Sequence, residues 1–214
     1  TIAGDRRRLS QVLGNLIGTQ VDGASPLGNN SVGVAIIDTS NNTIGGTASG
    51  AGNTIAFNGN DGVFVMFAQS GTGNAILGNR IFSNSGLGID LDPNNVTPND
   101  AGDGDTGANN LQNFPVLTSA TATASSTNIQ GSLNSSPNTA FRIELFASEA
   151  ADPAGFGEGQ TLLGAIDVTT DSAGDVNFQA AFPTSLPPGR FVTATATVLR
   201  SGGGFGDTSE YSQA

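Results

Sequence analysis

Short segments in which apolar residues alternate with other residues recur along the first 92 positions of the chain. Three of them follow a glycine, and these begin at Gly33, Gly62 and Gly88, so that the spacing is 29 and then 26 residues. Apolar positions with a period of two are typical of β-strands. Because glycine and asparagine fill the positions between the segments, the spacing leaves no room for a helix, and this part of the chain is predicted to be all-β.

Asparagine marks the turns of the repeat. The pattern Asn-x-Ile occurs at residues 42–44, 53–55, 74–76 and 79–81. Asparagine tolerates a left-handed backbone at corners, and its side-chain amide can form hydrogen-bonded ladders between stacked strands. We therefore predict a short right-handed parallel β-helix over residues 1–92, with about three to four coils stacked about 4.8 Å apart. The Leu-x-x-Leu-x-Leu spacing of a leucine-rich solenoid is absent from the sequence.

The apolar positions of the repeat are predicted to fill the inside of the coils. This predicted interior consists of Ile17, Val34, Ile36, Ile44, Ile55, Val63, Val65, Ile76, Ile81, Ile89 and Leu91. Four phenylalanines are predicted to pack in the core or between coils, with an outward-facing binding stripe as the alternative. They are Phe57, Phe64, Phe67 and Phe82.

Residues 1–3 (Thr-Ile-Ala) repeat residues 54–56. We therefore expect the chain to start inside a coil and the natural protein to be longer. An uncovered end of a β-helix is an open strand edge, which is a template for pairing with another chain. We expect an upstream coil or a neighbouring subunit to cover it. The three arginines at positions 6–8 depart from the repeat.

The pattern changes at about residue 118, where the repeat ends and longer alternating segments begin. The seven predicted strands cover residues 120–125, 127–133, 141–146, 162–169, 176–182, 191–199 and 208–212. Seven short antiparallel strands separated by turn residues are typical of a β-sandwich, so residues 118–214 are predicted to form an immunoglobulin-like or fibronectin-like domain. The cysteines and tryptophan of antibody domains are absent, so only the architecture is predicted.

The junction between the two predicted domains, residues 93–117, is rich in Asp, Asn and Gly. Five aspartates lie in it or just before it: Asp90, Asp92, Asp100, Asp103 and Asp105. Ca²⁺ takes six to eight oxygen ligands, and Asp alternating with Gly lets a short loop turn several oxygens toward one point. The sequence therefore predicts a structural Ca²⁺ site formed by these aspartates. The alternative is a solvated acidic linker in which they only form turns.

Composition excludes whole classes of chemistry. The chain has no His, no Cys and no Lys, so it lacks a Ser-His-Asp triad, a thiol nucleophile, a Schiff-base lysine and the usual zinc ligands. A net charge of −11 argues against nucleic-acid binding. No apolar run of about 18 residues is present, so we expect no membrane insertion. Acid–base catalysis by two carboxylates stays open, but no two carboxylates of the coils occupy equivalent outward positions beside an arginine.

Several motifs together resemble a family of large bacterial surface or secreted proteins, in which right-handed β-helix repeats precede an immunoglobulin-like domain. The motifs are NTIGGT at 42–47, GNTIA at 52–56, NSGLGIDL at 84–91, NDAGDGDTG at 99–107, LQNFPVL at 111–117, GEGQT at 157–161 and TSEYS at 208–212. The resemblance implies the same two-part architecture, export from the cell and a surface, adhesive or matrix role. It transfers no catalytic residue.

We therefore expect a non-catalytic, extracellular or cell-surface structural module, without a catalytic or cofactor-binding residue. It would self-associate into a fibre or array by head-to-tail stacking of coils or by strand donation. One alternative is a carbohydrate-binding adhesin that uses the lateral face of the coils. Another is a Ca²⁺-dependent lyase or hydrolase acting on an acidic polysaccharide, which a net charge of −11 would repel.

Overall fold

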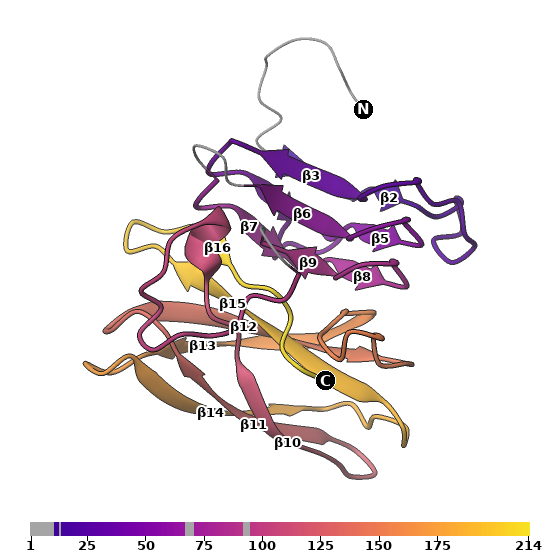
Figure 1. Cartoon of the computed structure of the whole chain (residues 1–214). Helices are drawn as coiled ribbons and strands as arrows, with labels where there is room; N and C mark the ends of the chain where they lie inside the picture. Colours follow the sequence, from indigo (N-terminus) through magenta and orange to yellow (C-terminus); the bar gives the residue numbers. More distant parts are fainter. Residues whose placement is uncertain (1–10, 13, 67–70, 92–94) are drawn as a thin grey trace.

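Three parallel sheets form the first half of the chain (Figure 1), in a computed structural model that describes residues 11–12, 14–66, 71–91 and 95–214. Their strands within these residues are β1 (Gln11–Val12), β2 (Leu16–Ile17), β3 (Val34–Ile37), β4 (Thr43–Gly45), β5 (Thr54–Ala56), β6 (Val63–Met66), β7 (Ala75–Leu77), β8 (Arg80–Phe82) and β9 (Ile89–Asp90). The sheet orders are β1-β4-β7, β2-β5-β8 and β3-β6-β9. The chain thus visits the three sheets in turn. We call each circuit a coil, so that the first coil carries β1 to β3 and the last coil carries β7 to β9.

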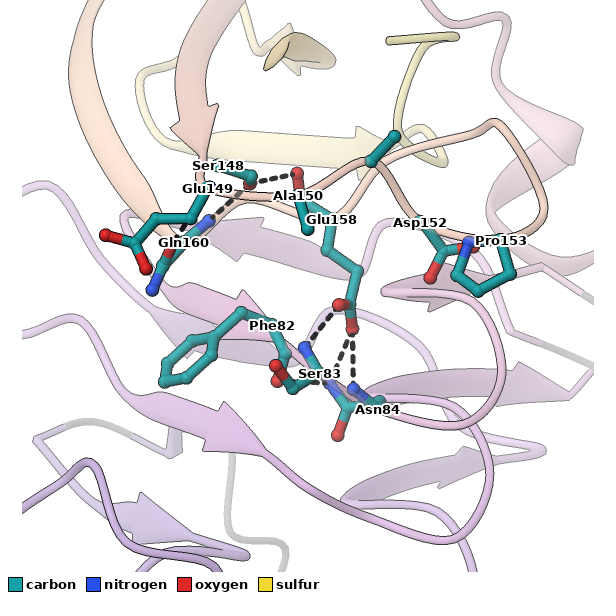
Figure 2. Close-up of a pocket in the computed structure, with 11 residues that line it drawn as sticks. Phe82, Ser83, Asn84, Ser148, Glu149, Ala150, Asp152, Pro153, Glu158 and Gln160 are labelled. Carbon is teal, nitrogen blue, oxygen red and sulfur yellow. Dashed lines mark hydrogen bonds between the residues drawn. The ribbon is translucent and has the colours of Figure 1, made fainter. Parts of the chain in front are cut away.

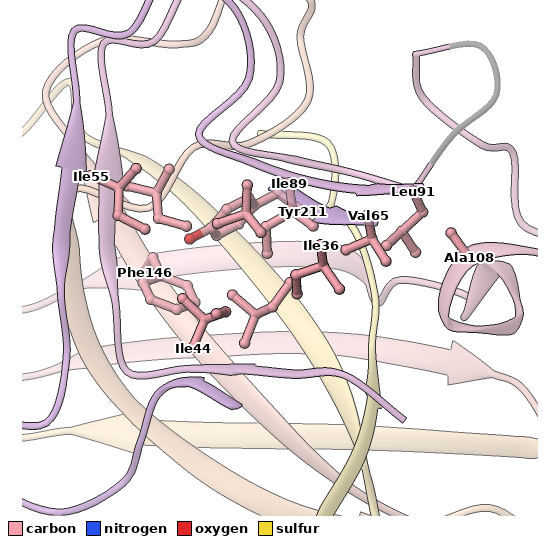
Figure 3. Close-up of a cluster of buried hydrophobic side chains, with 12 residues drawn as sticks. Ile36, Ile44, Ile55, Val65, Ile89, Leu91, Ala108, Phe146 and Tyr211 are labelled. Atoms are coloured by element: carbon pink, nitrogen blue, oxygen red, sulfur yellow. The ribbon is translucent and has the colours of Figure 1, made fainter. Parts of the chain in front are cut away.

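Apolar side chains stack in columns inside the coils because equivalent positions pair in register. Ile17 pairs with Ile55 and Ile55 with Ile81. The predicted interior is confirmed: nine of its eleven residues are buried in one apolar cluster, and Ile17 and Val34 are partly buried against it. Figure 3 shows part of this cluster. Phe57 and Phe82 pack edge to face across neighbouring coils, as predicted.

Three ladders of asparagine side chains connect the coils at their corners. The ladders are Asn15–Asn53–Asn79, Asn29–Asn58–Asn84 and Asn42–Asn74–Asn109. Within the coils, the backbone N–H and the side-chain NH₂ of one asparagine both donate to the side-chain oxygen of the next. At Asn53 these bonds to Asn79 are 3.0 and 2.8 Å long. The expected ladders are therefore present, and they satisfy polar groups that burial would otherwise leave unpaired.

Two antiparallel sheets form the second half, with strand orders β10-β11-β14 and β13-β12-β15-β16. Their strands are β10 (Val116–Ala122), β11 (Thr127–Asn134), β12 (Ala140–Ser148), β13 (Thr161–Thr169), β14 (Asp175–Phe182), β15 (Phe191–Leu199) and β16 (Phe205–Thr208). Side chains from both sheets form a second apolar cluster, in which Ile129 and Phe178 of one sheet meet Phe141 and Leu145 of the other. A short turn, η1 (Ala108–Leu111), precedes them. The prediction of an all-β chain is confirmed.

The predicted last strand was placed wrongly. The sequence predicts a strand over 208–212, whereas β16 spans Phe205–Thr208. The reason is that Glu210 and Tyr211 are buried, with Glu210 bonded to the last coil and Tyr211 packed in the coil cluster. The first strand of this half starts at Val116 rather than at residue 120, because β11 pairs with it from there. Residues 1–3, residues 6–8 and Phe67 lie outside the described residues.

Candidate functional site

The outer edge of the last coil is covered by backbone and hydroxyl groups from the antiparallel half. The Thr208 hydroxyl accepts a 2.9 Å hydrogen bond from the N–H of Ile76 in β7. Gly159 and Ile81 in β8 exchange two backbone hydrogen bonds: the Ile81 N–H donates to the Gly159 carbonyl at 2.9 Å, and the Gly159 N–H donates to the Ile81 carbonyl at 2.8 Å. An unpaired strand edge would attract another chain. These contacts close the edges of β7 and β8 within the molecule.

Glu158 covers the corner next to β8. Its carboxylate accepts hydrogen bonds from the backbone N–H of Asn84 at 3.0 Å, from the side-chain NH₂ of Asn84 at 2.9 Å and from the backbone N–H of Ser83. Figure 2 shows the carboxylate pointing at these donors. Both of its oxygens are therefore occupied by groups of the last coil.

Two further buried glutamates make equivalent contacts at other positions of the last coil. The carboxylate of Glu210 accepts the N–H of Leu91, directly after β9, at 3.1 Å and the N–H of Thr97 at 2.9 Å. Glu144 in β12 accepts the N–H of Gly78 at 2.7 Å and the guanidinium N–H of Arg142 at 3.2 Å. We call Glu144, Glu158 and Glu210 the cap glutamates. Together they satisfy backbone donors that burial at this end would leave unpaired.

Burial raises the pKa values of the cap glutamates. It raises the pKa of Glu158 to about 7 and that of Glu210 to about 7, and it raises the pKa of Glu144. Hydrogen bonds from the last coil oppose this shift in all three. Charged neighbours add to it, with Asp152 acting on Glu158, and Asp90 and Asp61 acting on Glu210. Perturbed carboxyl groups are a frequent mark of catalytic sites, so their other contacts decide their role.

Aromatic side chains from the antiparallel half close the apolar interior of the coils. Phe146 of β12 and Tyr211 pack edge to face, with ring centroids 5.3 Å apart, and both belong to the coil cluster, as does Ala108 (Figure 3). Sequence reasoning missed these residues and the cap glutamates. The repeat carries no signal for them, because they lie outside it; the one available sign is that the only tyrosine of the chain directly follows a glutamate in the TSEYS motif.

A cavity of about 410 Å³ lies beside Glu158, between the last coil and the loop after β12 (Figure 2). Its lining includes Phe82, Glu149, Asp152 and Gln160. Several of its polar groups already have partners: Glu149 pairs with Arg190 at 2.9 Å, and the Gln160 side-chain oxygen accepts the Glu149 N–H at 3.1 Å. The cavity is polar and offers a small number of groups to a ligand.

Three of the five predicted metal-binding aspartates lie together. Asp100, Asp103 and Asp105 each place one carboxylate oxygen so that these atoms are within 4.8 Å of one another. Asp103 is committed to the loop, since its oxygens accept the N–H of Asn113 at 2.9 Å and the hydroxyl of Ser135. Burial raises the pKa of Asp103, and the charges of the other two aspartates add to the shift.

The donor set of this aspartate cluster fits a hard cation. Oδ1 of Asp100 and Oδ1 of Asp105 are shielded from solvent, and neither accepts a hydrogen bond from any residue that the structure describes. A shielded anionic oxygen without a donor is costly unless a cation approaches it. The cluster therefore suits Ca²⁺ chemically, because Asp100 and Asp105 each offer it a carboxylate oxygen.

Of the other two predicted ligands, Asp90 is not grouped with these three aspartates. Asp90 is buried in β9, where its charge acts on Glu210, and it is not among the grouped aspartates. Asp90 lies apart because β9 belongs to the last coil, whereas the cluster lies in the junction loop. Asp92 lies outside the described residues.

Comparison with known proteins gives no assignment. No protein-family model matches the chain, and the search of curated proteins finds no match either. Within the described ranges, no helix has the length and apolar character needed to cross a membrane. The interpretation of function therefore depends on the geometry alone.

Proposed function

We propose that the chain is a non-catalytic structural module in which an immunoglobulin-like β-sandwich terminates a right-handed parallel β-helix. The observation that carries this proposal is the cap on the last coil. Backbone, hydroxyl and carboxylate groups of the antiparallel half bond to the ends of all three parallel sheets. Solenoid proteins need a terminal unit that ends the stack, because each repeat contacts only its neighbours.

The finer description of the fold rests on two features. Strands that return to the same three sheets once per circuit, with asparagine ladders at the corners, support the β-helix. Two antiparallel sheets of three and four strands that share one core support the immunoglobulin-like sandwich. A crystal structure with a continuous helical path and a sandwich of this strand order is the direct test.

The contacts of the cap glutamates favour a structural role over catalysis. A general acid or base needs a carboxyl oxygen that can reach a substrate proton. Both oxygens of Glu158 and both oxygens of Glu210 bond to nitrogen donors of the chain. Release of reducing ends from uronate polymers, measured with and without EDTA, tests the remaining lyase or hydrolase hypothesis. Turnover that disappears in Glu158→Gln while folding is retained would overturn the structural assignment.

The cap also restricts how such modules assemble. Head-to-tail stacking of identical coils needs both ends of the stack, and here the end after the last coil is occupied by the sandwich. Assembly at a cell surface or in a matrix would then use the first coil or strand donation. Light scattering after gel filtration, together with negative-stain microscopy at rising concentration, tests this. Long filaments of the isolated chain would contradict a closed C-terminal end.

We also propose that Ca²⁺ binds the aspartate cluster and stiffens the junction. The support is the pair of shielded carboxylate oxygens on Asp100 and Asp105. Backbone carbonyls and water would complete the six to eight ligands that Ca²⁺ takes. The ion would stiffen a loop that is already joined to the end of β11, where Asn134 accepts the N–H of Gly102 at 2.8 Å.

A carbohydrate-binding adhesin is the second candidate, and the polar cavity beside Glu158 is the observation that favours it. Phe82 lies at its wall, and Glu149 and Gln160 offer hydrogen-bond partners for hydroxyl groups. A glycan array tests it directly. Binding that is lost in Gln160→Ala and kept in Asp22→Ala, a change in a distant exposed loop, would support this function.

A further inference from the structure

We infer that Ca²⁺ bound by the aspartate cluster regulates the closure of the last coil, because the loop that holds the cluster also inserts its tip into that coil. The inference deepens the proposed Ca²⁺ site and rests on it. We call residues 100–113 the closed loop. The aspartate cluster lies at the base of this loop, and η1 forms its tip.

The base of the closed loop is joined by Asn113, which is buried. The N–H of Asn113 donates to Oδ1 of Asp103 at 2.9 Å, and its side-chain NH₂ donates to the Asp100 carbonyl at 2.7 Å. In return, the side-chain oxygen of Asn113 accepts the N–H of Asp100 at 3.1 Å. The first and last residues of the loop are therefore bonded to each other beside the carboxylates that would hold the ion.

The tip of the closed loop completes one asparagine ladder of the coils. The side-chain oxygen of Asn109 accepts the N–H of Asn74, directly before β7, at 3.0 Å. The side-chain NH₂ of Asn109 donates to the Asn74 carbonyl at 2.7 Å and to the Thr208 carbonyl at 3.0 Å. Ala108 is fully buried in the apolar cluster of the coils, and Leu111 packs against that cluster (Figure 3). The turn η1 therefore closes the last coil by polar and apolar contacts.

The connections between the base and the tip are short. Residues 106–107 are all that lie between Asp105 and η1, and Gln112 is the single residue between η1 and the base. Gln112 is buried, and its side-chain NH₂ donates at 2.9 Å to the hydroxyl of Ser135, which in turn donates to Asp103. A displacement of the carboxylates at the base is thus transmitted to η1 through one or two residues and one chain of hydrogen bonds.

The backbone of η1 depends on support from both sides, because three consecutive residues are in the left-handed region. Asn109, Asn110 and Leu111 have φ values of 46°, 52° and 51°. A run of such residues is unfavourable for L-amino acids and persists only where the surrounding contacts fix it. Contacts with the coil fix one side of this turn, and the base of the closed loop fixes the other. A base that loosens therefore favours release of η1 from the coil.

The ion determines how firmly the base is held. Carboxylate oxygens of the three aspartates lie within 4.8 Å of one another, so their negative charges repel when no cation is present. Oδ1 of Asp100 and Oδ1 of Asp105 are shielded and accept no hydrogen bond from the residues that the structure describes. Bound Ca²⁺ would replace this repulsion by attraction. We therefore expect the ion to favour the conformation in which η1 occupies the coil and, by linkage, that conformation to favour the ion.

Amide hydrogen exchange of the full chain, followed by NMR in CaCl₂ and in EDTA, tests the effect of the ion on the tip. We expect Ca²⁺ to slow exchange at the N–H groups of Asn74 and Asn109 by about fivefold or more, which is the usual size of coupling between two sites. The reference is the N–H of Thr54, which donates to the carbonyl of Asn15 in another sheet. An equal slowing at this reference would show a general gain in stability and contradict a local effect on the last coil.

The reciprocal effect is measured with Asn109→Ala, which removes the ladder contact and leaves the three aspartates in place. Isothermal titration calorimetry should show Ca²⁺ binding about fivefold weaker in this variant than in the unmodified chain. The matched control is Asn128→Ala, near the end of β11 opposite to Asn134, and it should bind Ca²⁺ with unchanged affinity. Equal affinities of Asn109→Ala and the unmodified chain would contradict the coupling.

The outcomes separate this inference from the site on which it rests. Heat of Ca²⁺ binding without slower exchange at Asn74 and Asn109 would overturn the regulation and leave the Ca²⁺ site standing. Absence of any heat of Ca²⁺ binding would overturn both. If Asn109→Ala does not fold, hydrogen exchange of the unmodified chain decides alone, because it needs no substitution.

Discussion

Glu158 bonds to Asn84 in the way that one ladder asparagine bonds to the next. Asn84 donates its backbone N–H at 3.0 Å and its side-chain NH₂ at 2.9 Å to one carboxylate oxygen of Glu158. Asn58 donates the same two groups to the side-chain oxygen of Asn84, at 3.1 and 2.8 Å. The glutamate therefore takes the place of the asparagine oxygen that a further coil would supply, and the ladder ends on a side chain of the antiparallel half.

The first prediction concerns this substitute for a ladder oxygen. Glu158→Ala leaves the backbone N–H groups of Ser83 and Asn84 without their acceptor, while the side-chain NH₂ of Asn84 keeps its bond to the Ile55 carbonyl. Each buried unsatisfied group costs about 1–3 kcal/mol, so we expect a loss of about 2–4 kcal/mol in the free energy of unfolding. Urea denaturation measures it. The matched control is Glu149→Ala, whose exposed ion pair with Arg190 is worth at most about 1 kcal/mol. Equal losses for both variants would contradict the capping role.

The second prediction concerns pH. Burial raises the pKa of Glu158 and of Glu210 from 4.5 to about 7, so that between these values the folded state binds more protons than the unfolded state. The contribution of these two groups to the free energy of unfolding is then greatest below about pH 4.5, and it falls as the pH rises to about 7. Asp152 faces Glu158, and Asp90 and Asp61 face Glu210; their negative charges act in the same direction.

We therefore expect a higher Tm at pH 5 than at pH 8, measured by differential scanning calorimetry in buffers of equal ionic strength. The double variant Glu158→Gln with Glu210→Gln should flatten this difference, because neither side chain can then titrate. A Tm that increases from pH 5 to pH 8 would show that the hydrogen bonds from the last coil outweigh burial at both carboxylates.

The third prediction compares two positions of the same ladder. Asn58 is fully buried and is bonded to the coils on both sides, whereas Asn29 is exposed and its side chain bonds only to Asn58 among the described residues. We expect Asn58→Ala to lower the free energy of unfolding by about 2–4 kcal/mol and Asn29→Ala by about 1 kcal/mol or less. Chemical denaturation of both variants checks the gradient. Equal losses in the free energy of unfolding for the two variants would contradict a dependence on position in the ladder.

The sequence predicts the coils well because their physics is local and periodic. Ile55 and Ile81 occupy equivalent positions of a repeat, so the period of two and the spacing of Asn-x-Ile are enough to place them inside. The ends of the coils are different. Glu158 and Asn84 are 74 residues apart, and a glutamate in a polar segment carries no sign that it will be buried. The cap depends on contacts between the last coil and the antiparallel half, and no periodic sequence pattern predicts those contacts.

The same reasoning explains the mixed outcome at the aspartates. Alternation of Asp and Gly correctly predicts that Asp100, Asp103 and Asp105 converge, because short Gly-containing loops turn back on themselves. It does not place Asp90, which lies in a strand of the coils and outside this group. Position in β9 determines where this side chain lies, and β9 pairs with β6 rather than with the junction loop.

The last prediction separates two roles within the aspartate cluster. Asp103 holds the loop through Asn113 and Ser135, so Asp103→Ala should destabilise the protein whether or not Ca²⁺ is present. Oδ1 of Asp105 is one of the shielded oxygens without a donor, so without the ion Asp105→Asn removes only the repulsion from its aspartate neighbours and should not destabilise the protein. We expect millimolar CaCl₂ to raise the Tm of the unmodified chain and EDTA to reverse the rise, with no response in Asp105→Asn. Calcium binding measured by isothermal titration calorimetry gives an independent readout. A Tm that chelator does not change, together with no heat of calcium binding, would identify the cluster as a solvated acidic turn.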